Sequence, residues 1–216
     1  MLLDAGARFR LSELTISEWA EANMKVTSGK YQGNLSYHLT PYFRELVERA
    51  GPYSGFTEMV LMGAAQMGKT RAFIESVINY YISQFPRNIG YYTGDADLSE
   101  DSMKSLDNSL QGCGNDLLIK SQVIKPRNNS TGNTVKWKEY PGGKLHAQSA
   151  TQANKIRQRD EQLIFADDIE ASKSNSRNDG STVSLIRKRA NSYGDDKLII
   201  WSSTPKSFIN LSLIHI

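Results

Sequence analysis

One run of eight residues in the first third of the chain has a pattern suited to holding phosphate. Gly63 and Gly68 are separated by four residues, and Lys69 and Thr70 follow directly. The glycines let the backbone wrap closely round a phosphate, the lysine can reach the terminal phosphates of a triphosphate, and the threonine hydroxyl can ligate Mg²⁺. We expect Lys69 to act in catalysis and to face solvent at the start of a helix. The nucleotide-binding candidates are Gly63, Ala64, Ala65, Gln66, Met67, Gly68, Lys69 and Thr70, of which Thr70 is also a candidate metal ligand.

A second set of candidates follows an apolar run at residues 163–166. Asp167 and Asp168 come directly after it, and Glu170 lies two residues further on. Triphosphate hydrolysis needs carboxylates at the end of a strand close to the phosphate loop, one for Mg²⁺ and one to orient the attacking water. We expect Asp167 to hold the metal and either Asp168 or Glu170 to position water. Taken alone, such a pair is more often a helix cap or a turn, but the phosphate-loop pattern upstream favours the catalytic interpretation.

Thr204 is the last candidate taken from the residues alone. It follows the apolar run 198–201 within the sequence Ser202-Ser-Thr-Pro205. A hydroxyl at the carboxyl edge of a strand can hydrogen-bond the terminal phosphate or the neighbouring carboxylate, and so respond to hydrolysis. The alternative is an ordinary turn rich in Ser, Thr and Pro.

These groups must be positioned by alternating strands and helices. Apolar periodicity predicts helices over 14–24, 41–49, 69–85 and 98–110, strands over 58–62, 88–93, 163–166 and 198–201, and a hairpin of 134–137 with 144–147. Residues 27–40 carry no period and are expected to form an extended arm. Strands that alternate with crossover helices predict an α/β fold with a doubly wound, mostly parallel sheet flanked by helices.

Composition narrows the class of protein. A chain of 216 residues is long enough for one large domain, and its apolar runs are too short to span a membrane. The single cysteine, Cys113, excludes an internal disulfide and a Cys-based zinc site and favours a reducing compartment. There is no signal peptide pattern. The net charge of +3 permits a polyanionic partner without requiring one.

The order of several short motifs resembles the ATPase half of phage terminase large subunits of the lambda type, over about residues 11–207. The motifs are Leu14-Thr-Ile-Ser-Glu-Trp-Ala20, Thr40-Pro-Tyr-Phe-Arg-Glu45, the phosphate loop at 63–70, Tyr140-Pro-Gly-Gly143, Asp167-Asp-Ile-Glu170 and Ser203-Thr-Pro205. The resemblance implies a P-loop NTPase fold of the RecA/ASCE type, with an N-terminal helical arm over 1–40 and the ATPase domain over 41–210.

The resemblance also implies a function, cofactors and partners. The expected activity is hydrolysis of ATP, with Mg²⁺, to drive double-stranded DNA into a capsid. Expected partners are duplex DNA, a terminase small subunit, the portal of a procapsid and further copies of the chain, in the host cytoplasm and without a membrane. A nuclease domain is expected beyond about residue 210. Residues 211–216 match one reading frame of a common sequencing adapter and are set aside as an artefact.

The resemblance assigns roles to two further side chains and shows one departure. Tyr42 and Arg44 match the adenine-side motif of the family, the tyrosine offering a ring and the arginine a planar cation for stacking; the alternative places Tyr42 in the core. Thr204 falls in the coupling motif. The family usually has Asp-Glu where this chain has Asp167-Asp168.

Three points stay open at the level of sequence. Arg157 and Arg159 match a basic stretch of the family and could contact phosphate or DNA, or form a solvated turn. His38 and His146 show no ligand spacing, so structural roles are favoured. The alternative functions are a helicase-like DNA translocase and a nucleotide-binding assembly scaffold that does not hydrolyse ATP.

Overall fold

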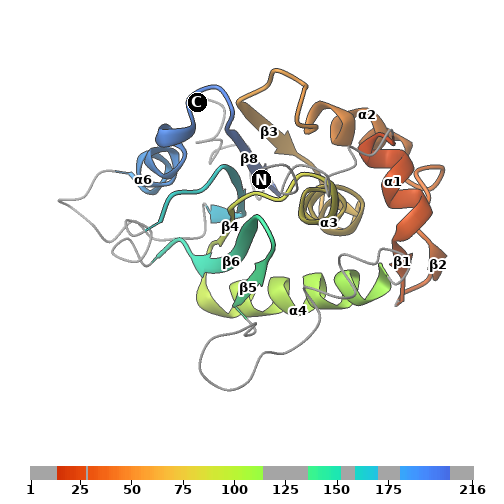
Figure 1. Ribbon diagram of the computed structural model, residues 1–216. Coiled ribbons are helices and arrows are strands. Elements are labelled where there is room, and N and C mark those ends of the chain that lie inside the picture. The colour runs from red at the N-terminus through yellow and green to blue at the C-terminus, as the bar shows by residue number, and fades with distance from the viewer. Residues whose placement is uncertain (1–13, 28, 114–135, 152–158, 170–180, 205–216) are drawn as a thin grey trace, which may run out of the picture.

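The computed structural model describes residues 14–27, 29–113, 136–151, 159–169 and 181–204 of the chain. A six-stranded sheet lies at its centre (Figure 1). Neighbouring strands are parallel except the pair at one edge, β6 and β5, which is antiparallel. This confirms the expected α/β fold with a mostly parallel sheet. In spatial order the strands are β3 (Glu58–Met62), β8 (Leu198–Ser203), β7 (Leu163–Asp167), β4 (Ile89–Thr93), β6 (Gly143–Ser149) and β5 (Trp137–Tyr140).

Helices cover both faces of the sheet. Figure 1 shows α6 on one side and α3 and α4 on the other. The bounds of the described helices are α1 (Ile16–Asn23), α2 (Pro41–Arg49), η1 (Lys69–Glu75), α3 (Ser76–Gln84), α4 (Ala96–Gly112), α6 (Thr182–Arg189) and the short η4 (Asn191–Tyr193). Apolar periodicity does not predict α6, in which only Leu185 and Ile186 are buried.

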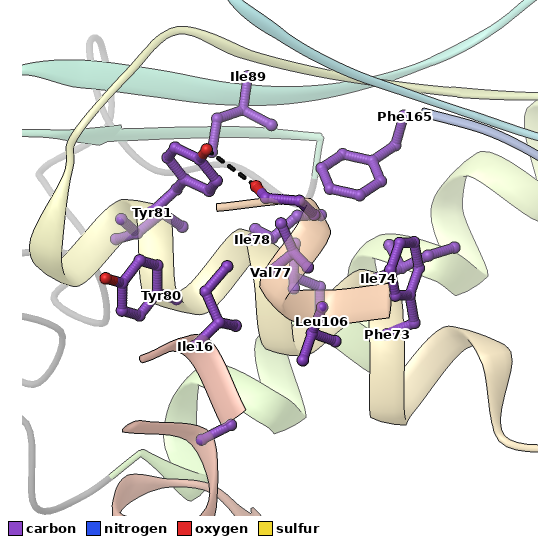
Figure 2. Packing of buried hydrophobic residues seen from close by; sticks show 14 of the residues in the cluster. Ile16, Phe73, Ile74, Val77, Ile78, Tyr80, Tyr81, Ile89, Leu106 and Phe165 are labelled. Carbon is purple, nitrogen blue, oxygen red and sulfur yellow. Dashed lines mark hydrogen bonds between the residues drawn. The ribbon is translucent and has the colours of Figure 1, made fainter. Parts of the chain in front are cut away.

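Alternate residues of the central strands β4, β7 and β8 supply two separate cores, because side chains of a strand point to opposite faces in turn. Phe165 and Ile200 join the larger core beneath α1 to α4, whereas Ile164 and Trp201 join the smaller one beneath α6. Figure 2 shows the larger core, where Phe165 lies among apolar side chains of the helices. This complete burial explains why these strands appear in the sequence as unbroken apolar runs.

The N-terminal segment packs into the larger core. Thr15 caps α1 with a full capping box to Glu18, which fixes where that helix begins. The expectation of an unpatterned extended arm over 27–40 misses two features: β1 (Lys25–Val26) pairs with β2 (Gly33–Asn34), and Leu35 and Tyr37 are buried. Tertiary contacts, which periodicity does not reveal, decide the conformation here.

The helix expected over 69–85 divides into two parts. Residues 69–75 form a π-helix, η1, and α3 continues from Ser76. A π-helical turn widens the backbone and is often found at functional sites. Tyr37 supports the widened segment, because its buried hydroxyl donates to the carbonyl of Ala72 at 2.9 Å.

The hairpin is also displaced from its expected position. The two strands pair directly around Pro141 and Gly142, with Tyr140 opposite Gly143, and Gly142 has a φ of 87°. Glycine is favoured at such a positive φ, so the turn centres on these two residues and extends the strands towards them.

Candidate active site

The phosphate loop joins β3 to η1. Its last residue, Gly68, has a φ of 91°, a conformation that favours glycine, and the following residue opens the helix. Gly63 lies close to Met67: a Cβ at position 63 would lie 2.4 Å from the Met67 sulfur, so this flexible side chain would have to move. Gln66 also has a positive φ, of 62°. A loop that alternates conformations in this way presents backbone N–H groups towards one side, as a phosphate cradle requires.

Three strand ends meet beside this loop. Because β3, β8 and β7 are parallel neighbours, their carboxyl ends lie at one edge of the sheet. The backbone fixes the junction: the N–H of Gly63 donates to the carbonyl of Ser203 at 3.2 Å, and the N–H of Asp168 donates to the carbonyl of Ser202 at 2.8 Å. Strand β8, which lies between β3 and β7, therefore holds the phosphate loop and the acidic pair Asp167 and Asp168 in fixed positions relative to each other.

Lys69 lies at the centre of the site and contacts both acidic residues and Thr204. Its Nζ lies 3.3 Å from Oδ1 of Asp167 and 3.8 Å from Oδ1 of Asp168, and it donates to Oγ1 of Thr204 at 3.1 Å. The side chain is only 9% exposed, so the expectation that Lys69 faces solvent is wrong. The two carboxylates and the hydroxyl stabilise the buried ammonium of Lys69. A lysine at an isolated helix start would have no such partners and would remain in water.

The two carboxylates have different surroundings. Asp167 is largely buried, and this burial raises the pKa of its carboxyl, although the nearby Lys69 ammonium opposes the shift. The hydroxyl of Tyr91 donates to Oδ2 of Asp167 at 3.4 Å. Asp168 is more exposed, has a φ of 48° and accepts a hydrogen bond from the backbone N–H of Thr204 at 2.7 Å. Aspartate is among the residues that tolerate this left-handed conformation.

The donor set fits a magnesium ion. Among the described residues, Oδ1 of Asp167 is buried and lies 3.3 Å from the Lys69 ammonium, and Thr70 follows Lys69 in the first turn of η1. Mg²⁺ takes oxygen ligands and uses one or two carboxylates together with substrate phosphates. The described residues contain no cluster of three or more His, Cys, Asp or Glu side chains of the kind that binds a metal without such help.

The remaining candidate residues lie further from Lys69. Tyr42 is 48% exposed and its hydroxyl donates to the carbonyl of Met67 at 2.7 Å, so it lies against the phosphate loop and not in the core. Arg44 lies 4.0 Å from the carboxylate of Glu21. Arg159 lies over the ring of Trp137, 4.7 Å from its centroid. Glu170 and Arg157 fall outside the described residues.

Two of the three histidines, His38 and His146, lie in the described part of the chain. His146 is buried, and its Nε2 lies 3.0 Å from Oε1 of the buried Glu161, whose two carboxylate oxygens also accept from the hydroxyl of Tyr92. Exposed His38 donates its backbone N–H to Ser36. Both arrangements fit the structural roles expected for them.

The sequence of residues 29–214 matches the family described as phage terminase large subunit gpA, ATPase domain. The chain belongs to this family. The terminase ATPase domain also resembles the crystal structure of the HK97 bacteriophage large terminase, with a TM-score of 0.64 at 13% sequence identity, over 88% of this chain and 37% of that one. The expected P-loop NTPase fold agrees with this likeness. No curated protein matches the chain.

A second solved structure has a weaker likeness. It is the large terminase of a thermophilic bacteriophage in complex with ATP-gamma-S, with a TM-score of 0.47 at 13% identity, over 77% of this chain and 36% of that one. The terminase ATPase domain thus spans little more than a third of the length of both large terminases. In the described part of the chain, no helix is both long enough and apolar enough to cross a membrane.

Several residues of the site cannot be found from the sequence. Tyr91 contacts Asp167 from the neighbouring strand β4, and Tyr37 supports η1 from the N-terminal segment. Neither carries a motif, because each acts through a contact between elements distant in sequence. Topology could have suggested Tyr91, since β4 pairs with β7, but the apolar run that contains it looks like ordinary core.

Proposed function

We propose that this domain hydrolyses ATP to drive the packaging of double-stranded DNA into a phage capsid. The observation that carries the proposal is the meeting of Lys69, Asp167, Asp168 and Thr204 at the ends of three strands. Membership of the terminase ATPase family supports the choice of ATP and of DNA packaging.

Each side chain has a role in this proposal. The backbone of residues 63–68 cradles the phosphates, and Lys69 neutralises charge on the terminal phosphate while remaining close to both carboxylates. Asp167 and Thr70 would hold Mg²⁺, which would neutralise negative charge on the phosphates.

The water-positioning role falls to Asp168, or to Glu170 if the shorter aspartate does not reach. Asp168 accepts from the backbone N–H of Thr204, so its carboxylate has a fixed orientation. Thr204 contacts both Lys69 and Asp168, which suits a group that transmits the state of the nucleotide to the rest of the protein. Tyr42 and Arg44 belong to the nucleoside side, with Tyr42 supporting the loop through Met67.

The partners are part of the same proposal. Duplex DNA, a terminase small subunit, the portal of a procapsid and other copies of the chain would meet the domain in the host cytoplasm. A nuclease would be carried by a separate C-terminal domain.

Phosphate release from ATP in the presence of Mg²⁺ tests the proposal. We expect Lys69→Ala to abolish release, because the variant lacks the ammonium that neutralises charge on the terminal phosphate. The exposed Lys188 of α6 provides the matched control, and Lys188→Ala should hydrolyse ATP as the wild type does. Equal turnover by the wild type and a folded Lys69→Ala variant would refute the proposed site.

A further inference from the structure

Two consecutive tyrosines of β4, Tyr91 and Tyr92, belong to opposite faces of the sheet, and each directs its hydroxyl to a largely buried carboxylate. Tyr92 belongs to the smaller core and donates to Glu161 at 2.8 Å. Tyr91 belongs to the larger core and donates to Oδ2 of Asp167 at 3.4 Å. The side chains of the two tyrosines are buried to the same degree. The main difference between them is therefore the carboxylate that each one contacts.

The register of the sheet brings Tyr91 next to the acidic end of β7. In the parallel pair of β4 and β7, Tyr91 lies opposite Phe165. The next residue of β7 on the same face is Asp167, because residues two apart on a strand point to the same side. The ring of Tyr91 packs edge-on against that of Phe165, with centroids 6.3 Å apart. This contact fixes the ring in the core and directs its hydroxyl towards Asp167.

The two oxygens of the Asp167 carboxylate have different partners. Oδ1 lies 3.3 Å from Nζ of Lys69, whereas Oδ2 accepts from the hydroxyl of Tyr91. A tyrosine hydroxyl carries its proton at neutral pH and adds no charge, so Tyr91 can hold the carboxylate without competing with a cation. In the proposed function Lys69 also neutralises charge on the terminal phosphate. Tyr91 has no such second task and can stay on Asp167 while Lys69 acts on the nucleotide.

We propose that Tyr91 is a positioning residue that orients the Asp167 carboxylate for Mg²⁺. The assignment rests on the proposed ATPase function, in which Asp167 holds the metal. Carboxylates that bind metals are themselves hydrogen-bonded, and loss of such an outer partner weakens metal binding roughly ten- to a hundredfold. Tyr91 acts through Asp167 and would not touch the nucleotide. Its loss should therefore weaken metal binding and leave the contacts to the phosphates as they are.

The contribution of Mg²⁺ to ADP binding by the 216-residue chain tests this assignment, because ADP would occupy the site without being hydrolysed. Titration calorimetry gives the affinity for ADP at saturating Mg²⁺ and in EDTA, and the ratio of the two affinities is the gain due to the metal. We expect Tyr91→Phe to lower this gain about tenfold and to leave the affinity in EDTA unchanged.

Tyr92→Phe is the matched control. It removes an equally buried hydroxyl that also contacts a carboxylate, but on the other face of the sheet, and it should keep the wild-type gain from Mg²⁺. Urea denaturation gives the stability of both variants. A purely structural role for the Tyr91 hydroxyl would lower stability in both variants and change the gain from Mg²⁺ in neither.

A double variant shows whether Tyr91 acts through Asp167. Asp167→Asn alone should lower the gain from Mg²⁺, because the metal loses its carboxylate. Adding Tyr91→Phe should cause little further loss, since the hydroxyl then has no carboxylate to orient. Losses that simply multiply in the double variant would mean that Tyr91 acts by another route, and the assignment would be wrong.

The remaining outcomes separate this assignment from the ATPase proposal. An undiminished gain from Mg²⁺ in a folded Tyr91→Phe variant would overturn the assignment and leave the ATPase proposal intact. Failure of Tyr91→Phe to fold would also overturn it, because the hydroxyl would then be needed for the fold. If Mg²⁺ gives the wild type no gain in ADP affinity, both proposals fall.

Discussion

Lys69 and Asp167 form an ion pair that is mostly removed from water, with Nζ and Oδ1 3.3 Å apart. Removing one partner of such a pair leaves an uncompensated charge, whereas removing both does not. The contribution of this ion pair to the free energy of unfolding and the role of Lys69 in turnover can therefore be measured separately.

We expect Lys69→Ala to lower the free energy of unfolding by about 3 kcal/mol, because the Asp167 carboxylate loses its cation. The double variant Lys69→Ala with Asp167→Asn should recover most of this loss and still release no phosphate. Urea denaturation gives the stabilities and a phosphate assay gives the turnover. Equal stability of the single and double variants would show that the two charges do not interact.

The π-helix η1 is the element that connects the phosphate loop to the core. It ends at Glu75, which is 2% exposed, accepts from the hydroxyl of Ser105 at 2.6 Å and lies 3.9 Å from Nε of Arg71. Burial raises the pKa of Glu75 to about 7, against the opposing effects of Ser105 and Arg71. The folded state thus holds a proton at Glu75 between pH 4.5 and about 7 that the unfolded state releases.

This proton makes stability depend on pH. The contribution of Glu75 is fully present below pH 4.5 and is lost as pH rises through about 7. The free energy of unfolding of the wild type should therefore fall by about 3 kcal/mol relative to Glu75→Gln between pH 5 and pH 8. Urea denaturation at both pH values measures it, with Glu45→Gln as the exposed control. A constant difference between wild type and Glu75→Gln would mean that Glu75 does not bind this proton.

The sequence predicts best those elements whose pattern is local. The strand over 58–62 and the helix over 41–49 have the expected bounds, because apolar period and Pro41 define them without distant contacts. The π-helical start at 69–75 and the burial of Tyr37 depend on packing between segments more than thirty residues apart, which no local period records.

In the candidate site, too, some features can be predicted from local sequence and others depend on contacts between distant residues. Motifs predict which residues belong together, and the structure brings Lys69, Asp167, Asp168 and Thr204 within hydrogen-bonding or ion-pairing range. Burial of Lys69 could not be predicted from its position after the loop, since it depends on two carboxylates almost a hundred residues away.

At the scale of the whole molecule, one sheet edge carries the proposed chemistry, and in our proposal duplex DNA is held elsewhere and repeatedly released. The net charge is only +3, and a motor that advances has to break each phosphate contact. We expect duplex DNA binding to be weak and independent of sequence, and to fall at least tenfold between about 50 and 200 mM salt. Fluorescence anisotropy with two unrelated duplexes checks this. A sequence-specific footprint that survives high salt would indicate a recognition module instead.

The acidic end of β7 and the phosphate loop act, in our proposal, as one catalytic centre. Asparagine tolerates the φ of 48° at position 168, so Asp168→Asn removes charge with little backbone cost. Asp167→Asn should weaken binding of ATP with Mg²⁺, because a hard cation loses its carboxylate.

Single-turnover hydrolysis, measured at saturating ATP and Mg²⁺ alongside nucleotide affinity, tests this catalytic centre most directly. We expect Asp168→Asn to retain wild-type affinity and to hydrolyse ATP at least about a hundredfold more slowly, since water positioning matters along the reaction coordinate. Normal hydrolysis by Asp168→Asn together with its loss in Glu170→Gln would contradict the assignment and move the catalytic carboxylate two residues along the chain.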